Sequence, residues 1–210
     1  MKKIIPFISL VLGVIFILSV YFFLKKDKEP FSPEFSNVHI FNSFKAVKPF
    51  ELKDESKALV NNSDLLNKWT IINFGYTSCP DICPTNLADA SIMIRILNED
   101  MGINDQIQSW FISLDPERDT HEIIGQYTNA FHPELTGLSA SNIEINALAL
   151  AFGFSYQIQA PIDDINNDIY WVAHSDMMIL INPQGQYAGY ISPPYNSQNM
   201  ALALSSLIKD

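Results

Sequence analysis

The sequence predicts an α/β domain in which a mixed sheet is flanked by helices, and this domain follows an N-terminal transmembrane helix. Three observations lead to this prediction. The chain starts with a long apolar run, two strand patterns enclose a helical pattern, and two later strand patterns flank Asn182-Pro-Gln-Gly185. A strand–helix–strand unit makes its strands parallel and a hairpin makes them antiparallel, so the sheet should be mixed.

The apolar run covers residues 4–24 and carries no charge. It reaches the ~20 residues that a helix needs to cross a bilayer. A cleaved signal peptide has a shorter apolar core and a small-residue cleavage site, whereas this run ends in Tyr21-Phe-Phe-Leu24. We therefore expect residues 1–24 to be an uncleaved, single-pass anchor. Lysines flank both of its ends, so the charges alone leave the orientation open, although the acidic domain is compatible with export. Our expectation is the inner (cytoplasmic) membrane, with the domain on the periplasmic side.

The segment after the anchor, residues 25–47, is polar and contains Pro30 and Pro33. We interpret it as a linker with little structure of its own. The domain itself is expected over residues 48–210.

The start of the domain predicts a pair of short strands followed by a buried strand. Residues 50–52 and 58–60 could pair, and Asn62 or Ser63 could cap a helical turn that ends at Lys68. Residues 69–76 are rich in β-branched and aromatic side chains, which is typical of a strand buried on both faces.

The later elements follow from helical periodicity, capping signals and strand patterns. Asp119 with Glu122, and Ser141 with Glu144, have the spacing of capping boxes. The predicted elements are helices up to about residue 99, from 119 to about 130, from 141 to 152 and from 197 to 209, and strands at 108–114, 155–159, 177–181 and 186–191. This order is that of a thioredoxin-like fold.

The charge balance limits the classes of partner. The chain has a formal net charge of −10, and the part after Leu24 has 11 basic and 23 acidic residues, or about −12. No cluster of Lys and Arg could follow a phosphate backbone, so we expect no nucleic-acid binding. A cationic ligand or a protein with a basic patch fits better.

The only two cysteines, Cys79 and Cys83, lie at the predicted junction of the first buried strand and its helix. Residues four apart share one face of a helix, so both sulfurs can point to one place. Free N–H groups and the helix dipole at this end should favour thiolates. The pair could therefore bind a soft metal or form a reversible disulfide.

A third ligand has to come from elsewhere in the chain. Of the four histidines, we interpret His39, His121 and His132 as surface residues, whereas His174 lies just before a predicted hairpin strand and can face the cysteines. Two sulfurs and one imidazole suit Cu(I), while structural zinc would require a fourth ligand. Spacing alone leaves a copper site and a plain dithiol both open.

Four segments together resemble the SCO/SenC family of copper chaperones for cytochrome c oxidase assembly. They are Phe74-Gly-Tyr-Thr-Ser-Cys-Pro-Asp-Ile-Cys-Pro-Thr85, Ser113-Leu-Asp-Pro-Glu-Arg-Asp-Thr120, Leu135-Thr-Gly-Leu138 and Val172-Ala-His-Ser175. The resemblance covers residues 45–210 and the N-terminal anchor. Tyr76 stands where the family commonly has Phe, and Ala173 where an acidic residue is frequent.

The resemblance implies a role for each matching residue. Cys79, Cys83 and His174 would hold a copper ion, and Asp81 would tune the site without necessarily binding the metal. The Asp115–Thr120 segment is interpreted as a proline turn followed by a helix cap, although Arg118 could face a partner.

The resemblance also implies partners: the copper-bearing subunit of cytochrome c oxidase as acceptor, and a copper donor protein. The protein would then be a metallochaperone rather than an enzyme. The leading alternative is a membrane-anchored thiol–disulfide oxidoreductase that uses Cys79 and Cys83, and the two functions could coexist. A peroxidase ranks last, because nothing in the sequence distinguishes one cysteine as the reactive one.

Overall fold

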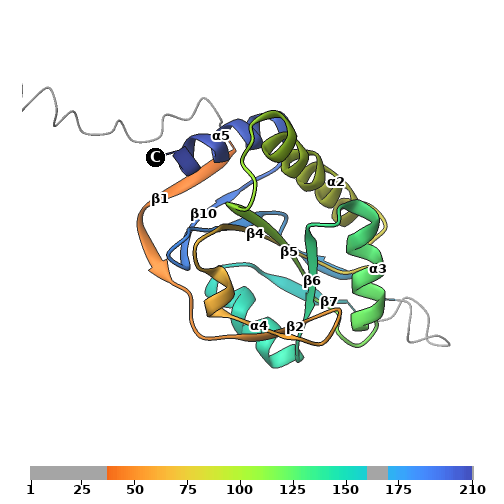
Figure 1. Ribbon diagram of the computed structural model, residues 1–210. Coiled ribbons are helices and arrows are strands. Elements are labelled where there is room, and N and C mark those ends of the chain that lie inside the picture. The colour runs from red at the N-terminus through yellow and green to blue at the C-terminus, as the bar shows by residue number, and fades with distance from the viewer. Residues whose placement is uncertain (1–36, 160–169, 210) are drawn as a thin grey trace, which may run out of the picture. The chain divides into compact units, whose positions relative to one another are not determined.

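In the computed structural model, the apolar segment at Trp69 forms the strand β4 (Trp69–Gly75), in which every residue is buried. A strand buried on both faces belongs in the interior of a sheet that is covered on both sides. The structure describes residues 37–159 and 170–209, and Figure 1 shows β4 in the middle of the sheet.

The main sheet has eight strands within the described residues, in the order β1-β10-β9-β4-β5-β6-β2-β3. β4 is parallel to β5, β5 is parallel to β6, and β9 is antiparallel to β4, which confirms the mixed sheet. The bounds are β1 (Val38–Ala46), β2 (Glu51–Asp54), β3 (Leu59–Asn61), β5 (Ile107–Ser113), β6 (Leu135–Ser139), β9 (Met178–Ile181) and β10 (Gln186–Ile191). A separate two-stranded sheet pairs β7 (Tyr156–Ile158) with β8 (Val172–His174).

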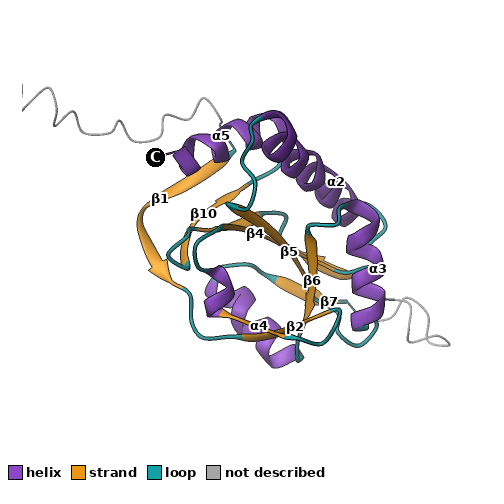
Figure 2. Cartoon of the chain, viewed as in Figure 1, coloured by secondary structure: helices purple, strands orange, loops and turns teal. Residues whose placement is uncertain are grey.

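Helices cover both faces of the main sheet, as Figure 2 shows. They are α2 (Ile82–Arg95), α3 (His121–Phe131), α4 (Asn142–Ala151) and α5 (Ser197–Lys209), with a π-helical turn η2 (Ile96–Asp100) after α2. Leu87 of α2 and Ile124 of α3 pack with Phe111 of β5, whereas α4 packs against Ile72 and its neighbours on the other face. This arrangement confirms the predicted thioredoxin-like fold.

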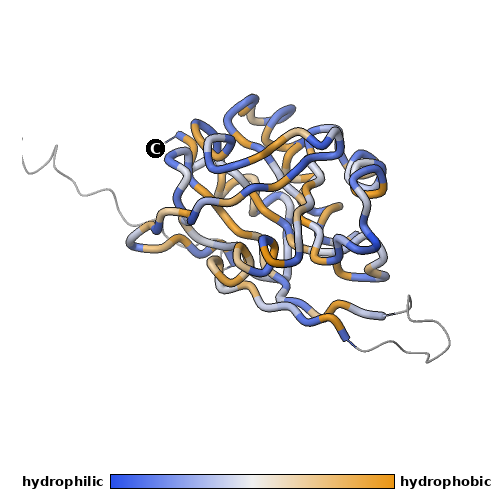
Figure 3. The backbone as a smooth tube through the Cα atoms, turned by 90° about the horizontal axis from the view of Figure 1, so that it is seen from below, coloured by the Kyte–Doolittle hydropathy of each residue, from blue (hydrophilic) through white to orange (hydrophobic). Residues whose placement is uncertain are grey.

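Hydropathy follows this layering. Figure 3 shows that hydrophobic stretches of the backbone gather mainly in the interior of the domain, and hydrophilic stretches mainly at its periphery. Phe74, Phe152 and Phe154 form an aromatic cluster, in which the centroid of the Phe74 ring lies 6.3 Å from that of Phe152 and 4.7 Å from that of Phe154. The core therefore extends up to the end of β4, where the cysteine loop begins.

Three strands were not predicted, and one of them is β8, which ends at His174. Residues 38–46, which we expected to belong to an unstructured linker, form β1 and pair antiparallel with β10. Residues 135–139 form β6, which pairs with β5. β1 is exposed at five of its nine residues, and β6 and β8 have only five and three residues, so none of them carries a strong strand pattern.

The helix starts differ in detail from the predictions. The residue that caps α3 is Thr120, whose side chain accepts a hydrogen bond from the Ile123 N–H, and not Asp119. Ser141 caps α4 as predicted. The short 3₁₀ helix η1 (Asn62–Leu65) is capped by Asn61 and ends three residues before Lys68.

The predicted membrane anchor at residues 1–24 lies outside the described residues. Over 37–159 and 170–209, no helix combines the length and the apolar character that a bilayer span requires.

Candidate metal centre

The cysteine loop joins the central strand to its helix. β4 ends at Gly75 and α2 begins at Ile82. The Cys79 N–H donates to the Tyr76 carbonyl oxygen at 3.1 Å, and the Cys83 N–H points at the Cys79 sulfur at 3.4 Å. Cys79 therefore lies in the turn before the helix, and not in the helix as expected, while Cys83 lies in the first helical turn. These backbone contacts bring the two sulfurs beside each other, with Cys79 half-buried and Cys83 only 3% exposed.

Gly75 makes room for the Cys83 sulfur. A Cβ atom at this position would lie 2.9 Å from Cys83 Sγ and 2.8 Å from the ring of Phe111. Both distances are too short for carbon contacts, so a side chain at residue 75 would displace the sulfur or the ring. The absence of a side chain at this position therefore helps to place Cys83.

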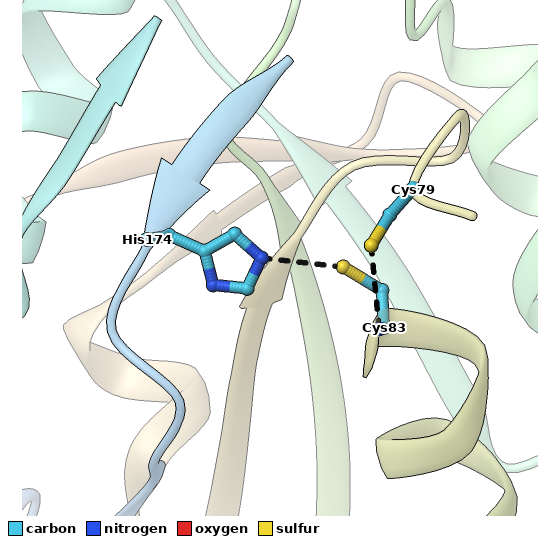
Figure 4. Close-up of side chains that lie close together, drawn as sticks. All are labelled: Cys79, Cys83 and His174. Atoms are coloured by element: carbon cyan, nitrogen blue, oxygen red, sulfur yellow. Dashed lines mark hydrogen bonds between the residues drawn. The ribbon is translucent and has the colours of Figure 1, made fainter. Parts of the chain in front are cut away.

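The imidazole comes from the last residue of β8. His174 Nε2 lies 3.4 Å from Cys83 Sγ, as Figure 4 shows. His174 Nδ1 lies 2.7 Å from the Ser175 carbonyl oxygen, which can only accept a hydrogen bond. The proton of the neutral ring therefore sits on Nδ1, and the lone pair on Nε2 faces the sulfurs.

Aromatic rings hold the imidazole on two sides. The Phe154 ring stacks on His174 with a centroid distance of 6.0 Å, and the Tyr76 ring meets it edge-on at 6.3 Å. Aromatic pairs of this kind contribute about 0.5–1.5 kcal/mol beyond their buried area. The ring of His174 is thereby held near the cysteines without any metal.

The donor set consists of two sulfurs and one nitrogen. The ligand atoms of Cys79, Cys83 and His174 all lie within 4.8 Å of one another, and no other potential metal-binding group of this kind occurs among the described residues. The nearby Asp176 carboxylate is outside this group and accepts hydrogen bonds from Asn86 and Tyr195. Soft sulfur donors with an imidazole fit Cu(I) better than hard, oxygen-seeking ions.

The protonation of Cys83 differs from the prediction. We expected the helix start to favour a thiolate, but burial raises the pKa of Cys83, and the neighbouring Cys79 and Asp176 raise it further. Loss of hydration outweighs the effect of the helix start, because one N–H dipole cannot replace the water around a buried anion. Without a metal, Cys83 is a neutral thiol that can donate to His174 Nε2, and metal binding has to displace this proton.

Other predicted residues have separate surroundings. Asp81 is exposed at the start of α2 and forms no side-chain cap, while its carbonyl oxygen accepts from the Thr85 hydroxyl. Its tuning role stays a prediction. His39 contacts Ser192, and His132 accepts a hydrogen bond from the Glu134 N–H, so neither joins the cysteines.

Local sequence patterns do not reveal that the loop between β5 and α3 contacts both halves of the site. Asp119, expected to be a helix cap, is 1% exposed and accepts hydrogen bonds from Thr77 in the cysteine loop and from Ser113. Asp115 and Arg118 instead contact Tyr170, four residues before His174. The polar residues of this loop are evident in the sequence, but its partners Thr77 and Tyr170 lie more than 40 residues away along the chain.

Comparison with known proteins identifies relatives of the chain. The SCO1/SenC family model matches residues 41–209. The SCO2-like protein of Rickettsia felis is 34% identical over 187 residues, which cover 88% of this chain and 86% of that protein. The mitochondrial SCO1 homolog 1 of Arabidopsis thaliana is 36% identical over 142 residues, which cover 68% of this chain but only 41% of that relative.

A solved structure also matches the fold. The crystal structure of Arabidopsis thaliana ScoI with copper bound has a TM-score of 0.67 and 32% sequence identity to this chain. The match covers 78% of this chain and 97% of that one. The similarity therefore extends over nearly all of the domain that carries Cys79, Cys83 and His174.

Proposed function

The chain belongs to the SCO1/SenC family, and on this basis we propose that it binds Cu(I) through Cys79, Cys83 and His174 and delivers it to the copper-bearing subunit of cytochrome c oxidase. The copper is cargo that a donor protein supplies. The residues 1–24 would anchor the domain in the inner membrane, on the periplasmic side.

One observation carries this proposal: a histidine from late in the chain lies against two neighbouring cysteines. His174 Nε2 is 3.4 Å from Cys83 Sγ although 91 residues separate them. A dithiol alone does not need this contact, whereas a soft three-donor site does. The copper-bound relative of the same fold supports the choice of metal.

The proposal predicts that His174 contributes directly to copper affinity. We expect His174→Ala in the full-length protein, purified in detergent, to weaken Cu(I) binding about a hundredfold, which corresponds to about 2.7 kcal/mol. Competition with a chromophoric Cu(I) chelator measures the affinity. His132→Ala is the matched control, because His132 lies at the end of α3 and outside the site. Wild-type affinity in His174→Ala would exclude the three-donor site.

Delivery requires a separate measurement. Copper-loaded protein should transfer Cu(I) to the soluble domain of the oxidase subunit when the two are mixed, and the Cys83→Ser variant should not. Metal content after separation of the two proteins reports the transfer. Copper that stays on the loaded protein at equilibrium would contradict delivery to this acceptor.

A second candidate function is thiol–disulfide exchange, and the unequal exposure of the cysteines favours it. Cys79 is half-buried, and Cys83, four residues later, is buried. Cys79 could therefore attack a disulfide of an acceptor and form a mixed disulfide. Cys83 would then attack Cys79 and release the reduced acceptor. In this function His174→Ala should leave the exchange rate nearly unchanged. Reduction of a disulfide-bonded acceptor by wild type and by this variant separates the two functions.

A further inference from the structure

The loop between β5 and α3, residues 114–120, contains two carboxylates that are almost fully buried. Asp115 and Asp119 are each 1% exposed. Burying a charged or polar group is costly unless it is hydrogen-bonded, so both carboxylates should have partners. Each of them has a partner in one of the two segments that carry the metal-binding residues.

Asp119 is bonded to the cysteine loop. Its Oδ2 accepts from the Thr77 N–H at 2.9 Å and from the Ser113 hydroxyl at 2.6 Å, and its Oδ1 accepts from the Thr77 hydroxyl at 2.5 Å. Thr77 lies two residues before Cys79. The carboxylate therefore ties the start of the cysteine loop to the end of β5.

Asp115 and Arg118 are bonded to the segment that carries the histidine. The Tyr170 hydroxyl donates to Asp115 Oδ1 at 2.6 Å, and Arg118 Nη1 donates to the Tyr170 carbonyl oxygen at 3.2 Å. Arg118 also forms an ion pair with Asp115. Its guanidinium carbon lies 3.5 Å from the centroid of the Tyr170 ring, which is a cation–π contact.

The same guanidinium reaches the cysteine side. Its carbon lies 5.8 Å from the centroid of the Tyr76 ring, and this ring meets His174 edge-on. The loop thus contacts the chain just before each half of the site: Thr77 and Tyr76 before Cys79, and Tyr170 before His174. β8, which ends at His174, is not part of the main sheet, so these contacts attach it to the body of the domain.

Resting on the proposed function, we propose that Asp115, Arg118 and Asp119 are positioning residues for the metal site, which hold the His174 segment against the cysteine loop. Arg118 and Asp115 position the imidazole through Tyr170, and Asp119 positions the sulfurs through Thr77. None of the three contacts the metal. A ring held in place before metal binding loses less freedom on coordination, so its affinity is higher.

The separate roles of Arg118 and Asp119 can be tested with a double-mutant cycle on Cu(I) affinity. Arg118→Gln should weaken Cu(I) binding about tenfold to a hundredfold, as for other outer-shell partners of metal ligands. In the His174→Ala background the same change should have no effect, because Arg118 acts through the imidazole. Asp119→Asn should weaken binding in both backgrounds, because it acts through the sulfurs.

Two further variants control for a general effect on folding. Arg95→Gln removes the other arginine of the chain, which is exposed on α2, and should leave the affinity unchanged. Tyr170→Phe keeps the ring over Arg118 and removes only the hydroxyl that donates to Asp115, so its effect should be smaller than that of Arg118→Gln. Equal losses from Arg118→Gln in the presence and absence of His174, or no loss in either, would overturn the proposal.

A metal-free readout separates this proposal from the copper function. In the apo protein, NMR should show proton–proton contacts of the His174 ring with Phe154 and Tyr76, and Arg118→Gln should weaken them while Arg95→Gln does not. If wild type binds no Cu(I) but these contacts depend on Arg118, the proposed function fails and the positioning role stands. Ring contacts that persist unchanged in Arg118→Gln would refute the positioning role directly.

Discussion

The sulfur half of the site is built on one continuous stretch of chain, whereas the imidazole half depends on contacts between distant segments. Cys79 lies in the loop that follows the central strand β4, and Cys83 lies in the first turn of α2. His174 ends a strand of the small two-stranded sheet. Local geometry therefore mainly defines where the sulfurs are, while tertiary contacts define where the imidazole is.

Removal of a sulfur should have the largest effect and break the site outright. We expect Cys83→Ser to weaken Cu(I) binding at least about a thousandfold, or about 4 kcal/mol, because soft thiolates dominate Cu(I) affinity. The loss should exceed that of His174→Ala. The chelator competition used above measures both variants, and an equal or larger loss in His174→Ala would reverse the ranking of the two halves.

A side chain at Gly75 should disturb the sulfur half without removing a ligand. In Gly75→Ala, the new Cβ would clash with Cys83 Sγ, and we expect about a tenfold to hundredfold weaker Cu(I) binding, as for other changes that reposition metal ligands. Gly125→Ala is the matched control, since its Cβ would lie 2.7 Å from Glu55 Cβ, an equally tight contact that involves none of the three ligands. Equal Cu(I) affinities in the two variants would contradict the spacing role of Gly75.

A pH series on the metal-free protein tests the burial of Cys83. Burial raises the pKa of Cys83 above its ordinary value of 9.0, so the folded state holds this proton more tightly than the unfolded state. The resulting stability is complete below about pH 9 and falls as pH rises toward the folded pKa, by at most about 1.4 kcal/mol per pH unit. Urea unfolding between pH 7 and 10.5 measures the slope.

The pH control is Cys83→Ala, which lacks this thiol. Buried tyrosines with raised pKa values, such as Tyr187, contribute to the slope in both proteins, so only the difference between the two slopes reports on Cys83. We expect the wild-type free energy of unfolding to fall more steeply with pH. Parallel slopes would mean that Cys83 is not protonated preferentially in the folded state.

The smallest effect is expected at Asp81. Its side chain is exposed and forms no cap on α2, so Asp81→Asn should change Cu(I) affinity by less than about threefold, or about 0.7 kcal/mol. The same competition assay measures it at low and high salt. A larger change that disappears in high salt would show that the carboxylate tunes the site through its charge.

Much of the fold could be predicted because its elements carry local patterns. The β-branched run of β4 and the capping serine at residue 141 both predict structure from adjacent residues. β1 could not be predicted in this way, since its exposed residues become a strand only by pairing with β10, about 150 residues later. Gly137 in β6 likewise weakens a strand pattern, although it lets Ile124 of α3 pack closely on the sheet.

The candidate site also combines residues that local patterns predict with residues that depend on distant contacts. The spacing of Cys79 and Cys83 predicts their proximity directly. His174 is predicted only because the other three histidines are interpreted as surface residues and because the family resemblance points to it. Asp119 illustrates the limit: its sequence context matches a helix cap, but its carboxylate bonds to Thr77, 42 residues away. Such a bond depends on which loops the fold brings together, and residues next to each other in sequence do not encode it.

The three-donor arrangement has a consequence for the mechanism of exchange. A Cu(I) ion held by two sulfurs and one nitrogen can accept a fourth donor before any existing bond breaks. An acceptor's thiolate could join the ion beside the half-buried Cys79, and the original ligands would then leave one at a time. Transfer should therefore be associative: its rate should rise with acceptor concentration, and the ion should not become free in water at any step.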